Sequence, residues 1–282
     1  MTEQIDTLIV GGGQAGLSLS YYLTQQRRSH VILEQAAQLA NAWRSHRWDS
    51  FTLVTPNWQI RLPGYEYQGD DPHGFLSRIE VVDYLERYAA SFNAPVRFGL
   101  RATAVEPKGA GYRVQTNEGE YEAANVVIAT GLFQQAKIPP FSANLPPEVK
   151  QLHSSEYRNP GGLPSGAVLV VGSAQSGCQI AEELYQSGRK VYLCVGGSSG
   201  RAPRRYRGKD CTWWLDQIGF YQRTVDQLAP GSRGPLLALS PLRIYTSNYP
   251  FIARTCLIYN HNSSISSLVW STGPSDLRPA GG

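Results

Sequence analysis

The chain has 282 residues, of which 41% are hydrophobic and 17% are charged. These proportions are typical of a globular protein and exclude a disordered chain, and the longest apolar runs are far shorter than the roughly 20 residues that span a bilayer. The formal net charge is +4, and five basic residues lie together in the segment 201–209, RAPRRYRGK. A local basic patch on a nearly neutral chain favours a phosphorylated small molecule over nucleic acid or a membrane as its partner.

The N-terminus and the cysteines also narrow the class of protein. The opening MTEQID is acidic and polar, unlike the basic and apolar start of a secretory signal, so we expect a cytoplasmic protein. The cysteines are far apart in the sequence and form no C-x-x-C motif: Cys178, Cys194, Cys211 and Cys256. They therefore predict neither a metal site nor a redox-active pair.

Residues 5–34 have the pattern of a β-α-β unit. IDTLIV (5–10) is typical of a buried strand, LSLSYYLTQQ has helical periodicity, and HVILE (30–34) predicts the next strand. Between the first strand and the helix lie Gly11, Gly13 and Gly16, at the spacing that permits a tight turn and a close approach to a pyrophosphate. Glu34 ends the second strand, where a carboxylate can accept hydrogen bonds from ribose hydroxyls. This unit predicts a site for FAD or NAD.

The middle of the chain predicts a helix followed by a small β meander. Residues 79–92 carry Val82, Leu85, Tyr88 and Ala89 on one helical face. Residues 111–131 alternate apolar and polar side chains around a turn at 117–119, which predicts antiparallel strands leading into a buried strand. The proline-rich stretch 139–147 predicts a linker.

A second β-α-β unit begins after this linker. VLVVG (168–172) predicts a strand, QSGCQIAEELYQS a helix that ends at Gly188, and KVYLCV another strand. Its loop, VGSAQSG, has Ala174 where the middle glycine of G-x-G-x-x-G is expected. The change adds one methyl group and keeps the spacing, so we interpret it as a tolerated variant.

The second unit predicts an NADPH site, because no carboxylate follows KVYLCV and serines and arginines stand there instead, as a 2′-phosphate requires. A solvated basic loop is the alternative interpretation. The candidate residues are Gly172, Ser173, Gln175, Ser176, Gly177, Ser198, Arg201, Arg204 and Arg205.

Together these patterns predict an α/β fold with two Rossmann-like dinucleotide-binding domains and a small antiparallel meander. We expect an FAD-binding domain at 1–145, a linker at 146–160, an incomplete NADPH-binding domain at 161–234 and an atypical tail at 235–282. From Gln227 onward the chain has one acidic residue, no lysine and no evident helical face. We expect an altered or truncated C-terminus, with a disordered surface tail as the alternative.

Residues 5–225 resemble the flavin-containing monooxygenase family, including its bacterial and YUCCA-like members. The resemblance rests on VGGGQAG, on Trp43-Arg44, on VVIATG at 126–131, on VGSAQSG and on LHSSEYRNP at 152–160. The last segment is similar to the family fingerprint F-x-G-x-x-x-H-x-x-x-(Y/F), with His153 and Tyr157 in place. Its ending favours the N- and S-oxidising branch over Baeyer–Villiger enzymes. We expect His153 to position domains rather than to transfer protons.

The resemblance also implies further site residues. It suggests that Trp43, Arg44 and the segment containing Thr55 and Asn57 lie near the flavin, with Asn57 as the candidate catalytic residue that holds the nicotinamide or the flavin adduct. It also implies that Thr130 and Gly131 let a loop pass close to the cofactor. The family's Gly-Gly before the tryptophan is replaced here by Asn-Ala.

The implied activity is that of a flavoprotein monooxygenase using FAD, NADPH and O2. NADPH reduces FAD, dioxygen forms a C4a-hydroperoxide, and a small nucleophilic substrate takes one oxygen atom. The alternatives are a weakly active or non-catalytic nucleotide-binding remnant, a Baeyer–Villiger enzyme, and a disulfide reductase, which requires the missing cysteine pair. We expect the aromatic segment 212–222 to be core, and the altered C-terminus to weaken FAD binding and turnover.

Overall fold

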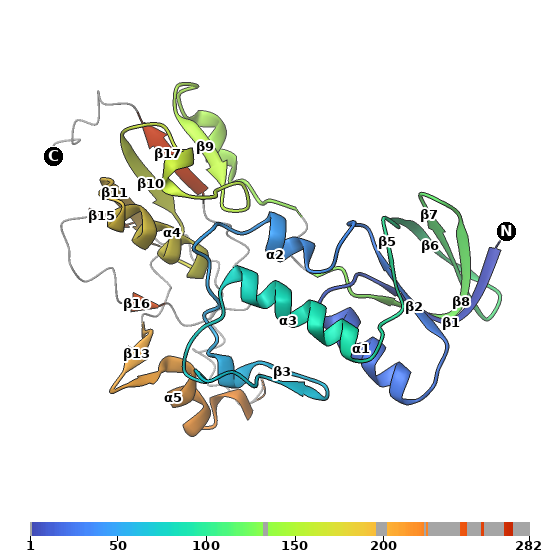
Figure 1. The fold of residues 1–282 in the computed structure, drawn as a ribbon. Helices are drawn as coiled ribbons and strands as arrows, with labels where there is room; N and C mark the ends of the chain where they lie inside the picture. The colour runs from blue at the N-terminus through green and yellow to red at the C-terminus, as the bar shows by residue number, and fades with distance from the viewer. Residues whose placement is uncertain are drawn as a thin grey trace. The chain divides into compact units, whose positions relative to one another are not determined.

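The computed structural model describes residues 2–131, 135–195, 202–222, 224, 243–246, 255–256 and 268–272. The chain divides into two compact units (Figure 1). The first unit comprises Met1–His46 and Asn57–Gln135, and the second comprises Arg47–Pro56 and Ala136–Gly282. Within the described ranges, no helix is both long and apolar enough to cross a membrane.

The first unit is built on a mixed six-stranded sheet of the Rossmann-like kind, in the order β5-β2-β1-β8-β7-β6. Parallel pairing joins β5, β2, β1 and β8, whereas β6, β7 and β8 form the antiparallel meander. The α/β architecture and the meander predicted from the sequence are confirmed. The strands are β1 (Thr2–Val10), β2 (His30–Glu34), β5 (Val96–Phe98), β6 (Ala102–Lys108), β7 (Gly111–Thr116) and β8 (Glu120–Ile128).

Helices α1 (Gln14–Gln25) and α3 (Arg78–Ser91) accompany this sheet. The start of α3 is set by a capping box, in which Ser77 accepts the Glu80 N–H and the Glu80 side chain accepts the Ser77 N–H. Its predicted apolar face is buried. The short elements of this unit are α2 (Asn41–Ser45), η1 (Asn57–Gln59), β3 (Arg61–Leu62) and β4 (Tyr65–Glu66).

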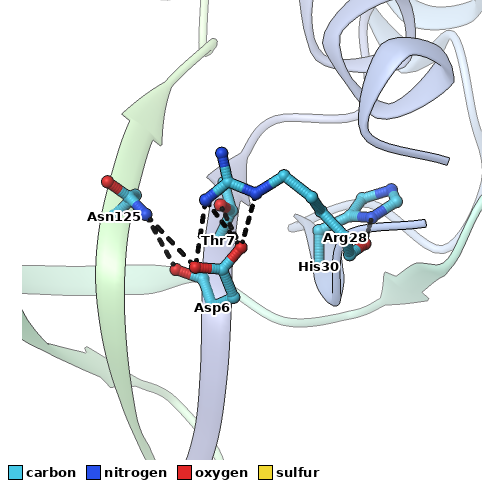
Figure 2. A network of polar contacts seen from close by, with 5 residues as sticks. All are labelled: Asp6, Thr7, Arg28, His30 and Asn125. Atoms are coloured by element: carbon cyan, nitrogen blue, oxygen red, sulfur yellow. Dashed lines mark hydrogen bonds and ion pairs between the residues drawn. The ribbon is translucent and has the colours of Figure 1, made fainter. Parts of the chain in front are cut away.

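A polar network reinforces the pairing of β1 with its neighbours (Figure 2). The Arg28 guanidinium donates to both carboxylate oxygens of Asp6, at 2.9 and 3.1 Å. The Asn125 amide, on β8, donates to the Asp6 carbonyl at 3.2 Å. The His30 ring contacts the Arg28 carbonyl and the buried Ser20 hydroxyl, at 2.9 and 2.8 Å. The network thus ties the turn between α1 and β2 to the strand that leads into the first glycine loop.

The second unit has a five-stranded sheet in the order β15-β11-β10-β17-β9. The predicted β-α-β pattern is present as β10 (Ala167–Val171), α4 (Gln175–Gln186) and β11 (Val191–Val195), and the two strands are parallel. The other three strands pair antiparallel with their neighbours: β9 (Lys150–His153), β15 (Arg243–Thr246) and β17 (Leu268–Thr272). Two of these strands, β15 and β17, lie beyond residue 235, where the sequence shows no regular pattern. Both are short, and they pair with β11 and β10, which are distant in the sequence.

Smaller elements complete the second unit. The aromatic segment 212–222 was expected to be core, and this expectation is wrong: Trp213 and Trp214 are half-buried, whereas Phe220 and Tyr221 are exposed. The two indole rings pack on each other, with centroids 4.8 Å apart. The short elements of the second unit are η2 (Pro140–Asn144), η3 (Pro160–Gly162), β12 (Ala202–Pro203), β13 (Arg205–Tyr206), β14 (Lys209–Asp210), α5 (Cys211–Gln217), η4 (Phe220–Gln222) and β16 (Thr255–Cys256).

Residues 47–56, which we call the strap, belong to the second unit although both flanking segments belong to the first. Trp48 is 1% exposed and lies in the core cluster of the second unit with Tyr157, Val168 and Ile180. The Asp49 N–H donates to the Arg158 carbonyl at 2.8 Å. The expected single domain over 1–145 is therefore interrupted by the strap, and residues 136–145 also group with the second unit.

Candidate nucleotide-binding sites

The first glycine loop joins β1 to α1, and two of its three glycines are required by the protein's own packing. Gly11 has a φ of +111°, and a Cβ there would lie 2.5 Å from the Ala129 carbonyl oxygen. A Cβ on Gly16 would lie 2.0 Å from the Gly11 carbonyl oxygen. Both distances are impossible for real atoms, so the tight turn and the close helix packing depend on these glycines.

Gly13 differs, because a Cβ at this position would meet no protein atom within 4 Å. The residue precedes α1 in an extended conformation, φ −85° and ψ −171°, which other residues also adopt. No side chain caps the helix, so the first N–H groups of α1 have no side-chain partner there. Open space beside uncapped N–H groups at a helix N-terminus fits an anion such as the pyrophosphate of a dinucleotide.

Glu34 is held against this loop by two backbone N–H groups. Gly12 donates to one carboxylate oxygen and Ala36 to the other, each at 2.9 Å. A carboxylate oxygen has two lone pairs, so each oxygen keeps capacity for a further donor. The observed position is compatible with the predicted bonds to ribose hydroxyls.

Residues 129 and 130 lie against the first glycine loop, whereas the approach of Thr130 and Gly131 to the cofactor stays a prediction. The Ala129 N–H donates to the Val10 carbonyl at 2.8 Å, which continues the β1–β8 pairing to the loop. A Cβ on Gly11 would approach the Thr130 Cα to 3.2 Å. Gly131 has a φ of +76°, a conformation that favours glycine. The segment that follows β8 therefore contributes backbone beside the candidate FAD site.

The structure gives Arg44 a clear role in holding α2. Its side chain donates to the Leu39 carbonyl at 3.1 Å and forms an ion pair with Glu86 of α3. Arg78 in turn donates to the Arg44 carbonyl at 3.1 Å. These bonds fix the helix that carries Trp43. Direct contact of Trp43 or Arg44 with the flavin stays a prediction.

The Asn57 side chain is 3% exposed and is occupied by backbone partners. Its amide donates to the Asp71 carbonyl at 2.9 Å and its oxygen accepts the Leu76 N–H at 2.8 Å. The Asn57 N–H donates to the Gly74 carbonyl at 2.9 Å. The residue holds the loop 71–76 in place, and its suggested catalytic role stays a prediction. Thr55, two residues earlier, is exposed.

The second glycine loop repeats the backbone of the first. Gly172 has a φ of +103°, close to the value at Gly11. Ala174 precedes α4 with φ −73° and ψ 179°, as Gly13 precedes α1, and again no side chain caps the helix. A methyl group is compatible with this extended conformation, so alanine is a conformationally acceptable replacement for the middle glycine. Gln175, Ser176 and Gly177 form the first turn of α4, and Ser173 is buried.

The structure describes only part of the basic segment. Ser198 and Arg201 lie outside the described residues. The Arg204 guanidinium donates to the Leu53 carbonyl at 3.2 Å and to the Thr52 hydroxyl at 3.4 Å, so it holds the strap. Arg205 is exposed on β13. Of the predicted arginines, the described part of the chain places Arg204 on the strap and Arg205 at the surface.

The HSSEY motif is a structural element of the second unit. His153 is 8% exposed, and its Nδ1 lies 2.7 Å from the Ser155 hydroxyl and 3.2 Å from the Ser155 backbone nitrogen. Burial lowers the pKa of His153. The Tyr157 hydroxyl, whose pKa is raised mainly by burial, donates to Glu183 of α4 at 2.7 Å. The Tyr157 bond anchors α4. The role of His153 in positioning domains stays a prediction.

Sequence reasoning did not single out Gln179 or Trp48, which the structure places at the strap. Gln179 follows the second glycine loop on α4, and its amide bonds to Thr52. The sequence carries no local signal for this contact, because the two residues are 127 positions apart.

The family model of the pyridine nucleotide-disulphide oxidoreductases matches residues 8–215, which include both glycine loops. The chain belongs to this family. It is an oxidoreductase related to the flavin monooxygenases, as the sequence resemblance indicated. The family name includes disulphide chemistry, but this sequence lacks the cysteine pair that such chemistry requires.

Several relatives in the family are similar over most of this chain. An uncharacterized CzcO-like oxidoreductase from Geobacillus kaustophilus is 41% identical over 78% of this chain and 62% of its own length. The probable indole-3-pyruvate monooxygenase YUCCA3 of Arabidopsis thaliana is 28% identical over 72% of this chain and 48% of its own length. A solved mutant of a flavin monooxygenase from Stenotrophomonas maltophilia is 29% identical with a TM-score of 0.63, covering 70% of this chain and 59% of that one. The chain thus spans less than two thirds of the length of these relatives.

Proposed function

We propose that this chain is the nucleotide-binding part of an FAD- and NADPH-dependent monooxygenase that transfers one oxygen atom from O2 to a small substrate by N- or S-oxidation. One observation carries the proposal: two glycine loops of the same backbone geometry each open a helix without a side-chain cap. Two dinucleotide sites in one chain suit the passage of a hydride from a nicotinamide to a flavin. The similarity to flavin monooxygenases supports the choice of reaction.

The residues of the first loop are those that would hold FAD. The N–H groups at the start of α1 would bind the pyrophosphate beside Gly13, and Glu34 would accept the ribose hydroxyls. FAD, when bound, would supply the redox chemistry of hydride acceptance and oxygen activation.

The residues of the second loop are those that would hold NADPH. The start of α4 would bind its pyrophosphate, with Ser173, Gln175 and Ser176 in the loop and first turn. The basic segment after β11 would bind the 2′-phosphate, because its serines and arginines suit a dianion and it has no carboxylate for a free hydroxyl. Arg201 and Arg205 are the arginines to test first, since Arg204 donates to the strap.

The function is tested on the purified chain with added FAD. We expect a flavin absorption spectrum, NADPH-dependent bleaching of that spectrum without oxygen, and formation of an oxygenated product from a thioether or a tertiary amine in air. A protein that stays colourless after FAD addition would support a non-catalytic role. Flavin bleaching without any oxygenated product would contradict the monooxygenase reaction but not the two nucleotide sites.

A preference for NADPH over NADH is expected from the basic segment. An arginine bound to a partly exposed phosphate dianion contributes about 1.5–3 kcal/mol, or roughly one to two decades of affinity. Replacing Arg201 or Arg205 with glutamine should therefore weaken NADPH binding by about tenfold or more and leave NADH nearly unchanged. The measurement is the dissociation constant of each nucleotide by titration calorimetry.

Arg207→Gln is the matched control, because it removes the same charge from the exposed turn between β13 and β14. If the basic segment acts only through its overall charge, the glutamine replacements of Arg201, Arg205 and Arg207 should weaken NADPH binding equally. Equal loss for NADPH and NADH, or no initial preference for NADPH, would show that the basic segment has another role.

A further inference from the structure

The strap is held on the second unit by bonds at several points. Trp48 anchors it in the core, with its indole against the Phe51 ring at a centroid distance of 4.9 Å. Asn159 donates to the Asp49 carboxylate at 2.7 Å. Arg204 donates to the Leu53 carbonyl at 3.2 Å. These contacts hold the strap on the second unit from Trp48 to Leu53.

Gln179 makes the contact that links the strap to the second glycine loop. Its Oε1 accepts the Thr52 N–H at 3.3 Å, and its Nε2 donates to the Thr52 carbonyl at 3.0 Å. The side-chain amide therefore pairs with both backbone groups of Thr52, as a neighbouring strand would. Gln179 lies on α4 four residues after Gln175, where the helix begins at the loop.

The strap leads directly to a segment that is fixed in the first unit. Only Val54, Thr55 and Pro56 lie between Leu53 and Asn57. Asn57 is buried and bonded to the backbone of the loop 71–76. Proline has a restricted φ, which limits how far this short connection absorbs a displacement. Thr52 is therefore joined to Asn57 by a connection of only four residues.

We propose that Gln179 is a positioning residue that links nucleotide occupancy of the second loop to the position of the strap, and through it to the segment 55–57. The inference rests on the proposed function, because it requires a dinucleotide at the second loop. A pyrophosphate bound at the start of α4 orders the first turns of the helix, and Gln179 conveys that order to the Thr52 backbone. Gln179 itself need not touch the nucleotide.

The test compares hydrogen exchange of peptides covering residues 47–56 with and without NADP⁺. In the unaltered chain we expect NADP⁺ to slow exchange at Thr52 and its neighbours. In Gln179→Leu we expect this protection to fall by about tenfold, because two hydrogen bonds are lost, while the NADP⁺ dissociation constant measured by calorimetry stays within about twofold. With FAD added, flavin reduction at saturating NADPH should slow while the KM for NADPH is unchanged.

Gln186→Leu is the control, since it makes the same replacement at the exposed end of α4. Gln179→Glu serves as the conservative variant: it keeps an acceptor for the Thr52 N–H, loses the donor, and should retain part of the protection. Absence of NADP⁺ binding to the unaltered chain would overturn the proposed function. NADP⁺ binding with full protection in Gln179→Leu, or equal loss in Gln186→Leu, would overturn the inference about Gln179 alone.

Discussion

Replacing Gly13 with valine is expected to leave the protein folded and to abolish its retention of FAD. A Cβ at this position meets no protein atom within 4 Å, and the backbone conformation is open to other residues, so the fold itself does not require glycine here. The same space lies beside the uncapped N–H groups that would bind the pyrophosphate. A branched side chain would occupy it. The measurement is the flavin-to-protein absorbance ratio after reconstitution and gel filtration.

Two further glycines make this experiment discriminating. Gly16→Val should disrupt the fold, because its Cβ would lie 2.0 Å from a backbone oxygen. Gly162→Val should change neither fold nor flavin content, because its Cβ would lie 3.9 Å from the Asn159 side-chain oxygen, an ordinary van der Waals contact. Normal flavin content in folded Gly13→Val would contradict the assignment of FAD to the first loop. Circular dichroism establishes folding in each variant.

Replacing Trp48 with alanine is expected to lower the free energy of unfolding of the second unit by about 3–5 kcal/mol. The side chain is 1% exposed and packs among the core residues of that unit, so its removal leaves a large cavity and frees the strap. The change is measured by urea denaturation followed by circular dichroism. Faster proteolytic cleavage within residues 47–56 is expected as an independent sign of strap release.

Trp214→Ala is the comparison, because this tryptophan is half-buried and its indole N–H donates to the Tyr206 carbonyl at 3.0 Å. This variant should lower the free energy of unfolding by about 1–2 kcal/mol, because a half-buried side chain removes less apolar area from water than a fully buried one. If Trp48→Ala lowers the free energy of unfolding less than Trp214→Ala does, the anchoring role of Trp48 is contradicted. Trp48→Phe should retain most of the stability, because it refills much of the volume.

Features that depend on local spacing could be predicted from the sequence. Both β-α-β units, the helix predicted at 79–92 and the antiparallel turn at 117–119 appear where the pattern indicated. The tolerance of Ala174 also follows, because the residue before a helix adopts an extended conformation that alanine shares with glycine. Periodicity and loop chemistry involve neighbours within a few residues, and a sequence displays these directly.

Tertiary structure alone decided which polar side chains serve the fold. The strap lies in the second unit because Trp48 packs in the core of that unit. Arg204 donates to the strap residues Thr52 and Leu53, which are more than 150 positions away in the sequence, so no local pattern indicates these contacts. Asn57 is committed to the loop 71–76, and β15 and β17 are ordered by distant strands. The sequence by itself determined the two glycine loops and their helices, since their geometry is local. The partners of isolated polar side chains depend on long-range packing, which no local pattern displays.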